Sequence, residues 1–357
     1  MSSKILLESH NLKNRTTGFG VFNYELIKAM AKIDFDQEIY LVAKNTKELS
    51  DEFEDKFNYL KYRSFHRLKP FSIRKKVDLW HSLNQNIKVE PFFKPKNYVL
   101  TIHDVNFLEE DTEDFNPKRA NFFREKIKRA NYITFISEYA KNQTVKHFDL
   151  SNIEHKVIYN GNSISEKLDL SDFVPEVDTT KPYFFSISAF MEKKNFVSLI
   201  EMIRLMPEYN LILAGNHDNE YGLKIKELIA KYKLENQVFL PGRITEQAKQ
   251  FYMKNCTAFV FPSFGEGFGL PPLEAMSFGK PILLSDKTSL PEVGGDISFY
   301  WTHFDPEYMK QVTLNALQTY SENKAYYVDE YLKRASSFDW NTAAKEYFEV
   351  YNSLLNK

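Results

Sequence analysis

Two glutamates, Glu266 and Glu274, are separated by seven residues in the stretch FGEGFGLPPLEAMSFGKP. Ionised carboxylates accept strong hydrogen bonds from hydroxyl groups, so a pair of them suits a ligand that is rich in hydroxyls. Three glycines lie around the first glutamate, at Gly265, Gly267 and Gly269. Because glycine has no Cβ, the backbone can turn sharply there and approach a ligand closely.

The elements expected on either side of this stretch form an anion site. The apolar run 257–261 predicts a buried strand, and residues 270–278 predict a helix that has Pro271 in its first turn and Gly279 after its end. Free N–H groups and the positive end of the helix dipole meet at the start of such a helix, so a phosphate is expected there. The carboxylates would repel that phosphate and must face hydroxyls instead. The combination describes a nucleotide-sugar; an ordinary turn with two solvated glutamates is the alternative.

Length and composition limit the remaining choices. At 357 residues the chain suits two domains, and 47 Lys and Arg against 48 Asp and Glu give no argument for nucleic-acid binding. The single Cys256 excludes an intrachain disulfide framework and fits a reducing compartment. The first ten residues hold an apolar run too short for a signal peptide, so we expect a cytosolic protein.

Short apolar runs alternate with helical patterns along the whole chain, which predicts an α/β fold with parallel, doubly wound sheets. We expect a first domain over 1–165 and a second over 182–339, joined by a linker rich in Ser, Asp and Pro. The expected strands are 5–8, 38–43, 59–65, 77–82, 97–102, 131–137 and 156–159 in the first domain, and 183–189, 210–214, 237–240, 257–261, 282–285 and 297–301 in the second. A final helix over 340–357 carries one apolar stripe.

Polar residues that directly follow these strands are site candidates, because ligands of open α/β sheets lie beyond the carboxyl ends of the strands. His103 and Asp104 follow the strand 97–102. Lys194 lies in a polar loop before a helix, where an ammonium group can meet phosphate. Arg243 follows the strand that ends at residue 240. A solvated loop lysine is the alternative for Lys194.

The loop TTGFG, which ends at Gly20, resembles a dinucleotide fingerprint but lacks its third glycine. A dehydrogenase is therefore disfavoured, and Gly20 is either a ligand contact or a turn that needs a positive φ. The pair Asp34 and Asp36 matches metal-binding carboxylates formally, yet its place between a helix and a strand favours a solvated turn. We predict no metal site and no cofactor, since Lys194 and backbone amides can neutralise phosphates.

The stretch from Phe264 to Pro281 resembles the signature of the family 4 retaining glycosyltransferases of GT-B fold. The segments TIHDVNFLEE, ISEYAKNQ and YNGNS resemble family segments at corresponding positions along the chain. The resemblance implies two Rossmann-like domains that face a cleft, with the acceptor held mostly by the first and the nucleotide-sugar donor mostly by the second. It also implies a C-terminal helix that crosses back to the first domain, and transfer of a sugar with retention of configuration.

The resemblance also implies roles for individual residues. His103 would lie against the transferred sugar, Glu266 would hold sugar hydroxyls, and Lys194 would stabilise the leaving diphosphate, so these three form the catalytic set. The implied donor contacts are Gly20, Asp104, Lys194, Arg243, Gly267, Phe268, Gly269, Leu270 and Glu274, the last of them on the ribose. Family members often carry an arginine where this chain has Ser188 and Ala189, and Arg243 is the candidate substitute.

The segment TIHDVNFL is most similar to the mannosyltransferase branch of bacterial O-antigen and capsular polysaccharide synthesis. GDP-mannose is therefore the first donor to expect, before UDP-hexoses and UDP-N-acetylhexosamines, with a saccharide or lipid-linked saccharide as acceptor. Two other classes stay open: a catalytically silent sugar-nucleotide-binding partner in polysaccharide assembly, and an epimerase or phosphorylase-like enzyme on the same fold.

Residues 61–76 contain seven Lys or Arg, His66 and no acid, interleaved with three aromatic residues. This mixture suits the anionic inner face of a cell membrane, where basic side chains are attracted to acidic lipids. A solvated loop and helix face is the alternative.

Overall fold

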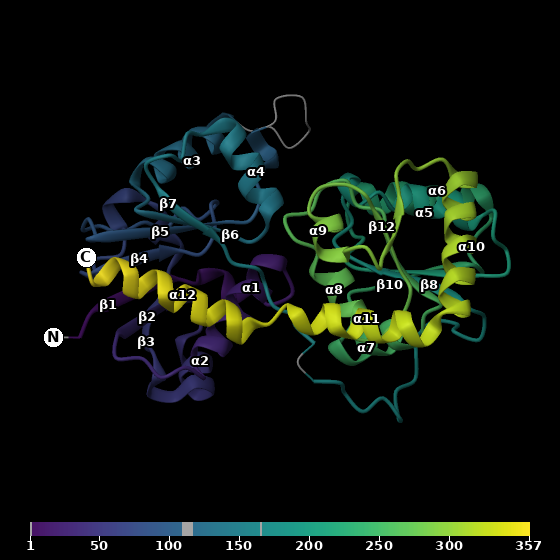
Figure 1. The fold of residues 1–357 in the computed structure, drawn as a ribbon, viewed down its shortest axis with the longest axis horizontal. Coiled ribbons are helices and arrows are strands. Elements are labelled where there is room, and N and C mark those ends of the chain that lie inside the picture. The colour runs from purple at the N-terminus through teal and green to yellow at the C-terminus, as the bar shows by residue number, and fades with distance from the viewer. Residues whose placement is uncertain (1, 109–116, 165) are drawn as a thin grey trace. The chain divides into compact units, whose positions relative to one another are not determined.

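The computed structural model describes residues 2–108, 117–164 and 166–357. The chain divides into two compact units: unit 1 holds residues 1–163 and 338–357, and unit 2 holds residues 164–337 (Figure 1). The segment 166–181, expected as a linker, belongs to unit 2. No helix among the described residues is long and apolar enough to span a membrane.

Unit 1 is built on a parallel sheet of seven strands in the order β3-β2-β1-β4-β5-β6-β7. Its strands are β1 Lys4–Glu8, β2 Glu38–Ala43, β3 Asn58–Lys61, β4 Leu79–Ser82, β5 Asn97–Ile102, β6 Tyr132–Phe135 and β7 Glu154–Val157. Its helices are α1 Gly18–Met30, α2 Thr46–Phe53, α3 Pro117–Arg129, α4 Glu138–His147 and α12 Trp340–Leu355, with short 3-10 turns η1 His10–Lys13, η2 Glu54–Lys56, η3 Ser64–Arg67, η4 Lys69–Phe71 and η5 Asn106–Leu108.

Helices cover both faces of this sheet, which explains why its central strands are apolar runs rather than alternating patterns. Helices α3 and α4 lie on one face, and α1, α2 and α12 lie on the other (Figure 1). In β1 the side chains of Ile5, Leu6 and Leu7 are all fully buried, although successive side chains point to opposite faces.

Helix α1 begins at Gly18, inside the loop TTGFG. Thr17 caps it, because its Oγ1 accepts a hydrogen bond from the Gly20 N–H at 3.3 Å. Gly20 therefore lies in the first helical turn and not in a positive-φ turn. A Cβ on this residue would lie 1.8 Å from the carbonyl oxygen of Asn14, so the close approach of the preceding loop requires glycine.

The last helix, α12, packs on unit 1 through aromatic side chains whose hydroxyls reach the sheet. His81 of β4 is fully buried and is hydrogen-bonded through Nδ1 to the Tyr351 hydroxyl at 2.7 Å and through Nε2 to the Thr101 hydroxyl at 2.7 Å. Tyr347 lies 3.3 Å from the same Thr101 oxygen. This network fixes α12 on the sheet, and the expected return of the chain's last helix to the first domain is confirmed.

Unit 2 repeats the plan with six parallel strands in the order β10-β9-β8-β11-β12-β13. Its strands are β8 Tyr183–Ile187, β9 Asn210–Ala214, β10 Val238–Gly242, β11 Ala258–Phe261, β12 Ile282–Ser285 and β13 Phe299–Trp301. Its helices are α5 Phe196–Ile203, α6 Glu220–Tyr232, α7 Glu246–Asn255, α8 Leu270–Met276, α9 Leu290–Gly294, α10 Pro306–Glu322 and α11 Lys324–Ser337, with the 3-10 turn η6 Glu192–Lys194.

Each sheet has one point where the strand order reverses. In unit 1 this point is β1, which pairs with β2 on one side and β4 on the other. In unit 2 it is β8, which pairs with β9 and β11. Loops diverge at such a point beyond the carboxyl ends of the strands, so both reversals are where a ligand site is expected.

We expect Tyr351→Phe to lower the free energy of unfolding by about 1–3 kcal/mol, because it leaves a buried polar atom of His81 without its partner. Urea unfolding followed by circular dichroism measures the change. Tyr326→Phe, on a tyrosine that is 58% exposed, is the matched control and should shift stability by less than about 0.5 kcal/mol. Equal stabilities of the two variants would contradict the role of this network.

Candidate functional site

Two loops of unit 2 meet beyond the carboxyl ends of β8 and β11, and each contributes one predicted site residue. Lys194, at the end of η6, places its Nζ 2.5 Å from Oε1 of Glu266. The two side chains are only 12% and 13% exposed. Residues 72 positions apart in sequence thus form a sheltered ion pair at the strand-order reversal of unit 2.

Polar side chains from the loop after β12 hold the glycine-rich loop in place. The Ser289 hydroxyl donates to the carbonyl of Phe268 at 2.7 Å and to that of Glu266 at 3.1 Å. The Glu266 N–H donates to Oγ1 of Thr288 at 3.1 Å. Thr288 has φ +56°, a conformation that is costly for a β-branched residue and persists only where its surroundings hold it.

The first loop is also fastened to the second. The Lys193 carbonyl accepts from the Phe264 N–H at 2.7 Å and from the Ser263 hydroxyl at 3.1 Å. Asn195, directly after Lys194, has φ +53° and donates through its side-chain amide to the Pro262 carbonyl at 3.4 Å. The position of Lys194 beside Glu266 therefore rests on backbone contacts as well as on charge.

Of the three glycines in the loop, only Gly269 has a positive φ, of +115°, and it precedes the first residue of α8, Leu270. Helix α8 ends at Met276, two residues before the expected end. Gly279 then has φ +62°, so the left-handed residue expected after this helix is confirmed.

Glu274 of α8 forms a second ion pair, which the sequence did not predict. Its Oε1 lies 3.0 Å from Nζ of Lys249 on α7, and the same Nζ lies 2.9 Å from Oε2 of Glu246. Burial raises the pKa of Glu274, and the charge of Lys249 opposes that rise. Burial alone would lower the pKa of Lys249, but Glu274 and Glu246 outweigh it and raise that pKa. Lys249 therefore favours the ionised carboxylate.

Both glutamates keep one carboxylate oxygen for other partners. Within the described part of the chain, Oε2 of Glu266 and Oε2 of Glu274 make no hydrogen bond or ion pair. Each lysine therefore neutralises a glutamate while leaving one acceptor oxygen, which is the arrangement that hydroxyl groups of a ligand require.

His103 lies in unit 1 after β5, buried against Phe19 and Phe22 of α1, with ring centroids 4.9 and 4.6 Å away. Its Nε2 is 2.9 Å from the Leu83 carbonyl, which can only accept, so Nε2 carries the proton. Burial lowers the pKa of His103 to about 4. The imidazole is therefore neutral at pH 7, and Nδ1 is an acceptor.

The remaining predicted residues are placed as follows. Asp104 forms a 3.9 Å ion pair with Arg119, and its carbonyl accepts from the Gln85 side chain at 2.7 Å. Ser188 is half-buried and Ala189 exposed. Arg243 is exposed after β10, which β9 separates from β8. Among the described residues, no hydrogen bond or ion pair links Arg243 to Lys194 or Glu266.

The predicted site residues thus fall into two sets. Lys194, Arg243 and the residues from Glu266 to Glu274 belong to unit 2, and the structure brings Lys194 and Glu266 into direct contact. Gly20, His103 and Asp104 belong to unit 1. The carboxylates Asp34 and Asp36 are exposed, and the described residues hold no cluster of three or more His, Cys, Asp or Glu that could bind a metal ion.

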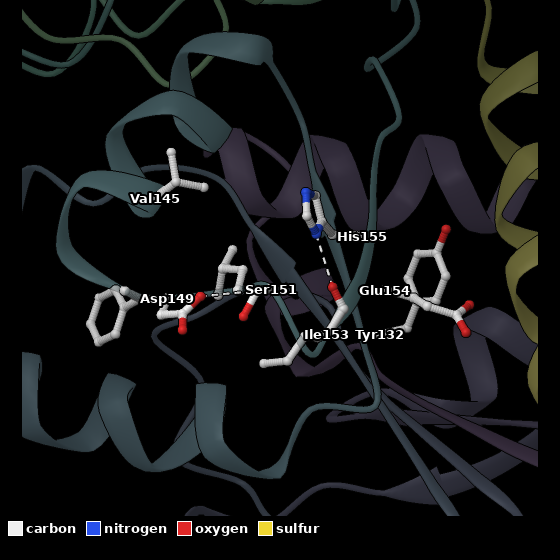
Figure 2. Close-up of a pocket in the computed structure, with 9 residues that line it drawn as sticks. Tyr132, Val145, Asp149, Ser151, Ile153, Glu154 and His155 are labelled. Atoms are coloured by element: carbon white, nitrogen blue, oxygen red, sulfur yellow. Dashed lines mark hydrogen bonds between the residues drawn. The ribbon is translucent and has the colours of Figure 1, made fainter.

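A surface pocket of unit 1 is lined by none of the predicted site residues (Figure 2). It is lined by Tyr132 of β6, by Val145 of α4, and by residues around the start of β7 such as Glu154 and His155. These are the amino ends of the strands, opposite the edge at which open α/β sheets bind ligands. We assign no function to this pocket.

Residues 169–306, all within unit 2, match the family of glycosyl transferases group 1. These residues resemble a group 1 glycosyltransferase domain. The family resemblance predicted from the sequence is confirmed by this match and by curated relatives along the chain.

Two relatives from Escherichia coli extend the similarity beyond residues 169–306. The O-antigen chain mannosyltransferase B is 24% identical over 98% of this chain and 100% of its own length. The serotype-specific mannosyltransferase WbdA is 28% identical over 77% of this chain, but the chain spans only about a third of WbdA, 36% of its length.

Solved structures are similar over the whole chain. A sucrose-phosphate synthase from Thermosynechococcus elongatus superposes with a TM-score of 0.76 at 16% identity, covering 100% of both chains. Anabaena HepE, in complex with UDP and glucose, superposes with a TM-score of 0.71 at 18% identity, covering 98% of this chain and 100% of its own. At such identities the likeness shows the fold alone, and the predicted GT-B fold is confirmed.

Three side chains that contact predicted site residues were not singled out from the sequence. Lys249 sits in an ordinary helical pattern, where a lysine is expected to be solvated. Ser289 directly precedes helix α9, which begins with Leu290 and Pro291. A serine before such a helix start is the one sequence signal that points to this residue. Gln85 accepts from the His103 N–H at 3.1 Å through a contact that no local pattern encodes.

We expect the stability of unit 1 to fall as the pH falls from about 6.5 toward 4, because buried His103 and His81 have pKa values lowered to about 4 and about 3. The unfolded chain binds these protons near pH 6.5 and the folded chain does not, so folding loses about 1–2 kcal/mol per histidine by pH 5. Urea unfolding at pH 7 and pH 5 measures the loss.

His103→Gln serves as the control, since its side-chain amide can still donate to the Leu83 carbonyl but does not titrate. The variant should lose less stability than the wild type between the two pH values. An unchanged pH dependence would mean that His103 is not buried in its neutral form.

Proposed function

We propose that the chain transfers a hexosyl unit from a nucleotide-sugar, with retention of configuration, onto a growing polysaccharide or a lipid-linked saccharide. GDP-mannose is the proposed donor, because curated relatives over most of the chain are named as mannosyltransferases. A UDP-hexose or UDP-N-acetylhexosamine is the second candidate, and it is favoured by the UDP-glucose complex of the structurally similar HepE.

The pairing of Lys194 with Glu266 is the observation that carries this proposal. A diphosphate that enters beside Lys194 offers the ammonium group a stronger anionic partner, so Glu266 is released toward the hydroxyls of the sugar. When the sugar leaves, negative charge grows on the diphosphate, and a lysine fixed at that point stabilises it. The ion pair thus keeps both groups in place until the donor replaces it.

The second ion pair supports the nucleoside half of the donor. Lys249 favours the charged form of Glu274 and leaves its Oε2 for a ribose hydroxyl. His103 is proposed as a sugar contact in which the neutral ring accepts a hydroxyl proton at Nδ1, because Nε2 is already bonded to Leu83. In the same proposal Gly20, Asp104, Arg243 and residues 267–270 are donor contacts.

The proposed reaction needs no metal ion, because Lys194 and the backbone amides near Phe268 and Gly269 would neutralise the leaving diphosphate. We propose that it takes place in the cytoplasm, at the inner face of the cell membrane when the acceptor is lipid-linked. The alternative of a catalytically silent nucleotide-sugar-binding partner is supported by Ser188 and Ala189, which stand where a second cation is expected.

We expect Glu266→Gln to reduce release of nucleoside diphosphate from the accepted sugar nucleotide by about 10–100-fold, since a hydrogen bond to a charged group is lost. A panel of GDP-mannose, UDP-glucose and UDP-N-acetylglucosamine, assayed with and without a chelator, identifies the donor and tests metal independence. Glu235→Gln, an exposed position before β10, is the control and should be unchanged.

Four outcomes would count against the proposal. Equal turnover by Glu266→Gln would remove its assigned role, and donor binding without hydrolysis or transfer would favour the silent partner. An isomerised sugar nucleotide, or a need for inorganic phosphate, would favour an epimerase or a phosphorylase-like enzyme.

We expect Lys249→Met to weaken GDP or UDP binding about tenfold at pH 7, because it removes the charge that opposes protonation of Glu274. The deficit should grow as the pH is lowered, since the pKa of Glu274 rises further without its partner. Isothermal titration calorimetry from pH 6 to pH 8 measures it. Lys249→Arg should restore affinity, and Lys254→Met, exposed on the same helix, should leave it unchanged.

A further inference from the structure

Two segments of unit 1, residues 61–76 and 91–96, expose large apolar side chains. Phe65 and Leu68 lie in and directly after η3, Phe71 lies in η4, and Phe92 and Phe93 lie in the loop between β4 and β5. Their side chains are between 38% and 56% exposed. We call the two segments together the aromatic-basic surface.

Backbone contacts and cation–ring contacts join the two segments into one surface. The Phe92 N–H donates to the Ile73 carbonyl at 3.0 Å, and Ile73 and Pro91 form an isolated parallel bridge. The rings of Phe65 and Phe71 are 5.6 Å apart, and those of Phe92 and Phe93 are 5.1 Å apart. The two segments, more than fifteen positions apart in sequence, are therefore adjacent, and each carries a pair of packed aromatic rings.

The segment 91–96 is anchored to unit 1 through the residue that precedes it. Glu90, directly before it, forms ion pairs with Lys126 at 3.3 Å and Arg129 at 3.2 Å and accepts from the Tyr98 hydroxyl at 3.2 Å. Lys126 is fully buried, so this junction is a fixed part of unit 1. Phe92 and Phe93 are thus exposed beside an anchored backbone and not at the tip of a loose loop.

The charge of the aromatic-basic surface has one sign. The two segments contain nine Lys or Arg and no Asp or Glu, although the whole chain has nearly equal numbers of basic and acidic residues. Cations also lie over the exposed rings: Cζ of Arg74 is 4.5 Å from the centroid of Phe92, and Nζ of Lys76 is 5.2 Å from that of Phe93.

We propose that the aromatic-basic surface docks the chain on an anionic lipid bilayer. Aromatic side chains gain stability at the boundary between headgroups and acyl chains, and neighbouring Lys and Arg are attracted to acidic headgroups. Both properties occur here on the same anchored surface, so apolar insertion and charge attraction act together.

Two other occupants fit the surface less well. Bases of a single-stranded nucleic acid stack on free aromatic faces, but Phe92 and Phe93 have cations over their rings and Phe65 and Phe71 pack against each other. A second copy of the chain would bring the same patch onto itself in a two-fold dimer, so its cations would face each other.

Co-sedimentation of the full chain with vesicles tests the proposal. One set of vesicles is phosphatidylcholine with about 30% phosphatidylglycerol, which gives a strongly negative surface potential. The other set is pure phosphatidylcholine, and both are tested at low and at high salt. We expect binding to the anionic vesicles at least tenfold stronger than to the neutral ones, and weakened by salt.

Two double variants separate the apolar and ionic contributions. Phe71→Ser with Phe92→Ser removes exposed rings, and Arg67→Gln with Lys69→Gln removes exposed charges. Each should weaken vesicle binding about tenfold or more. Tyr326→Ser with Lys324→Gln, on unit 2, is the matched control and should bind like the wild type. Circular dichroism melts confirm folding, since all six positions are on the surface.

Several results would overturn the proposal: no vesicle binding, equal binding to neutral vesicles, or unchanged binding by both aromatic-basic variants. Binding of a labelled oligonucleotide in place of vesicles would favour nucleic acid. A concentration-dependent dimer, lost in the phenylalanine double variant by light scattering, would favour a second copy.

The outcome is separable from that of the proposed hexosyl transfer. Release of nucleoside diphosphate with a water-soluble acceptor does not require a bilayer, and vesicle binding does not require a donor. If the chain binds anionic vesicles but turns over no sugar nucleotide, the proposed hexosyl transfer is contradicted and the proposed membrane docking is not. If the chain is active but does not bind vesicles, only the membrane docking is contradicted.

Discussion

The geometry of parallel strands is the constraint on which the rest of the structure depends. Each right-handed crossover returns the chain to the same end of the sheet, so every strand-to-helix loop of a unit leaves from one edge. Where the strand order reverses, two such loops diverge and leave room beside each other. Lys194 and Glu266 meet because β8 and β11 are neighbours at that reversal, although 72 positions separate the two residues in sequence.

Burial of charge explains why the site of unit 2 is built from pairs. A lone buried carboxylate would be costly and would tend to take up a proton, whereas a lysine at about 3 Å lets it stay ionised. Lys249 plays this part for Glu274, and Lys194 forms the corresponding ion pair with Glu266. Such pairs add little to stability, because desolvation offsets much of their attraction. Their value lies in holding charged groups at fixed places.

Much of the architecture could be predicted from local pattern. Buried parallel strands are continuous apolar runs, and the run 257–261 differs from β11 by only one residue at its start. Helix ends were predicted less well, because they depend on single residues: α8 ends at Met276, two residues before the expected end. Gly279 was predicted correctly since a left-handed residue after a helix is a local requirement. The positive-φ alternative for Gly20 was wrong, because the requirement for glycine there comes from the approach of the Asn14 carbonyl. The role of Lys249 was not predicted either, because its partner Glu274 lies 25 positions away on another helix.

Helix α12 has a consequence for the order in which the chain is assembled. The face of the first sheet that carries His81 and Thr101 is completed by Tyr347 and Tyr351, which are synthesised after the whole of unit 2. The first 163 residues therefore emerge from the ribosome with part of their apolar surface uncovered. Unit 2 can fold before helix α12 is available to complete unit 1. Exposed apolar surface of this kind favours aggregation during synthesis. Translation speed through the second half of the chain thus sets how long the nascent first unit must wait for its last helix.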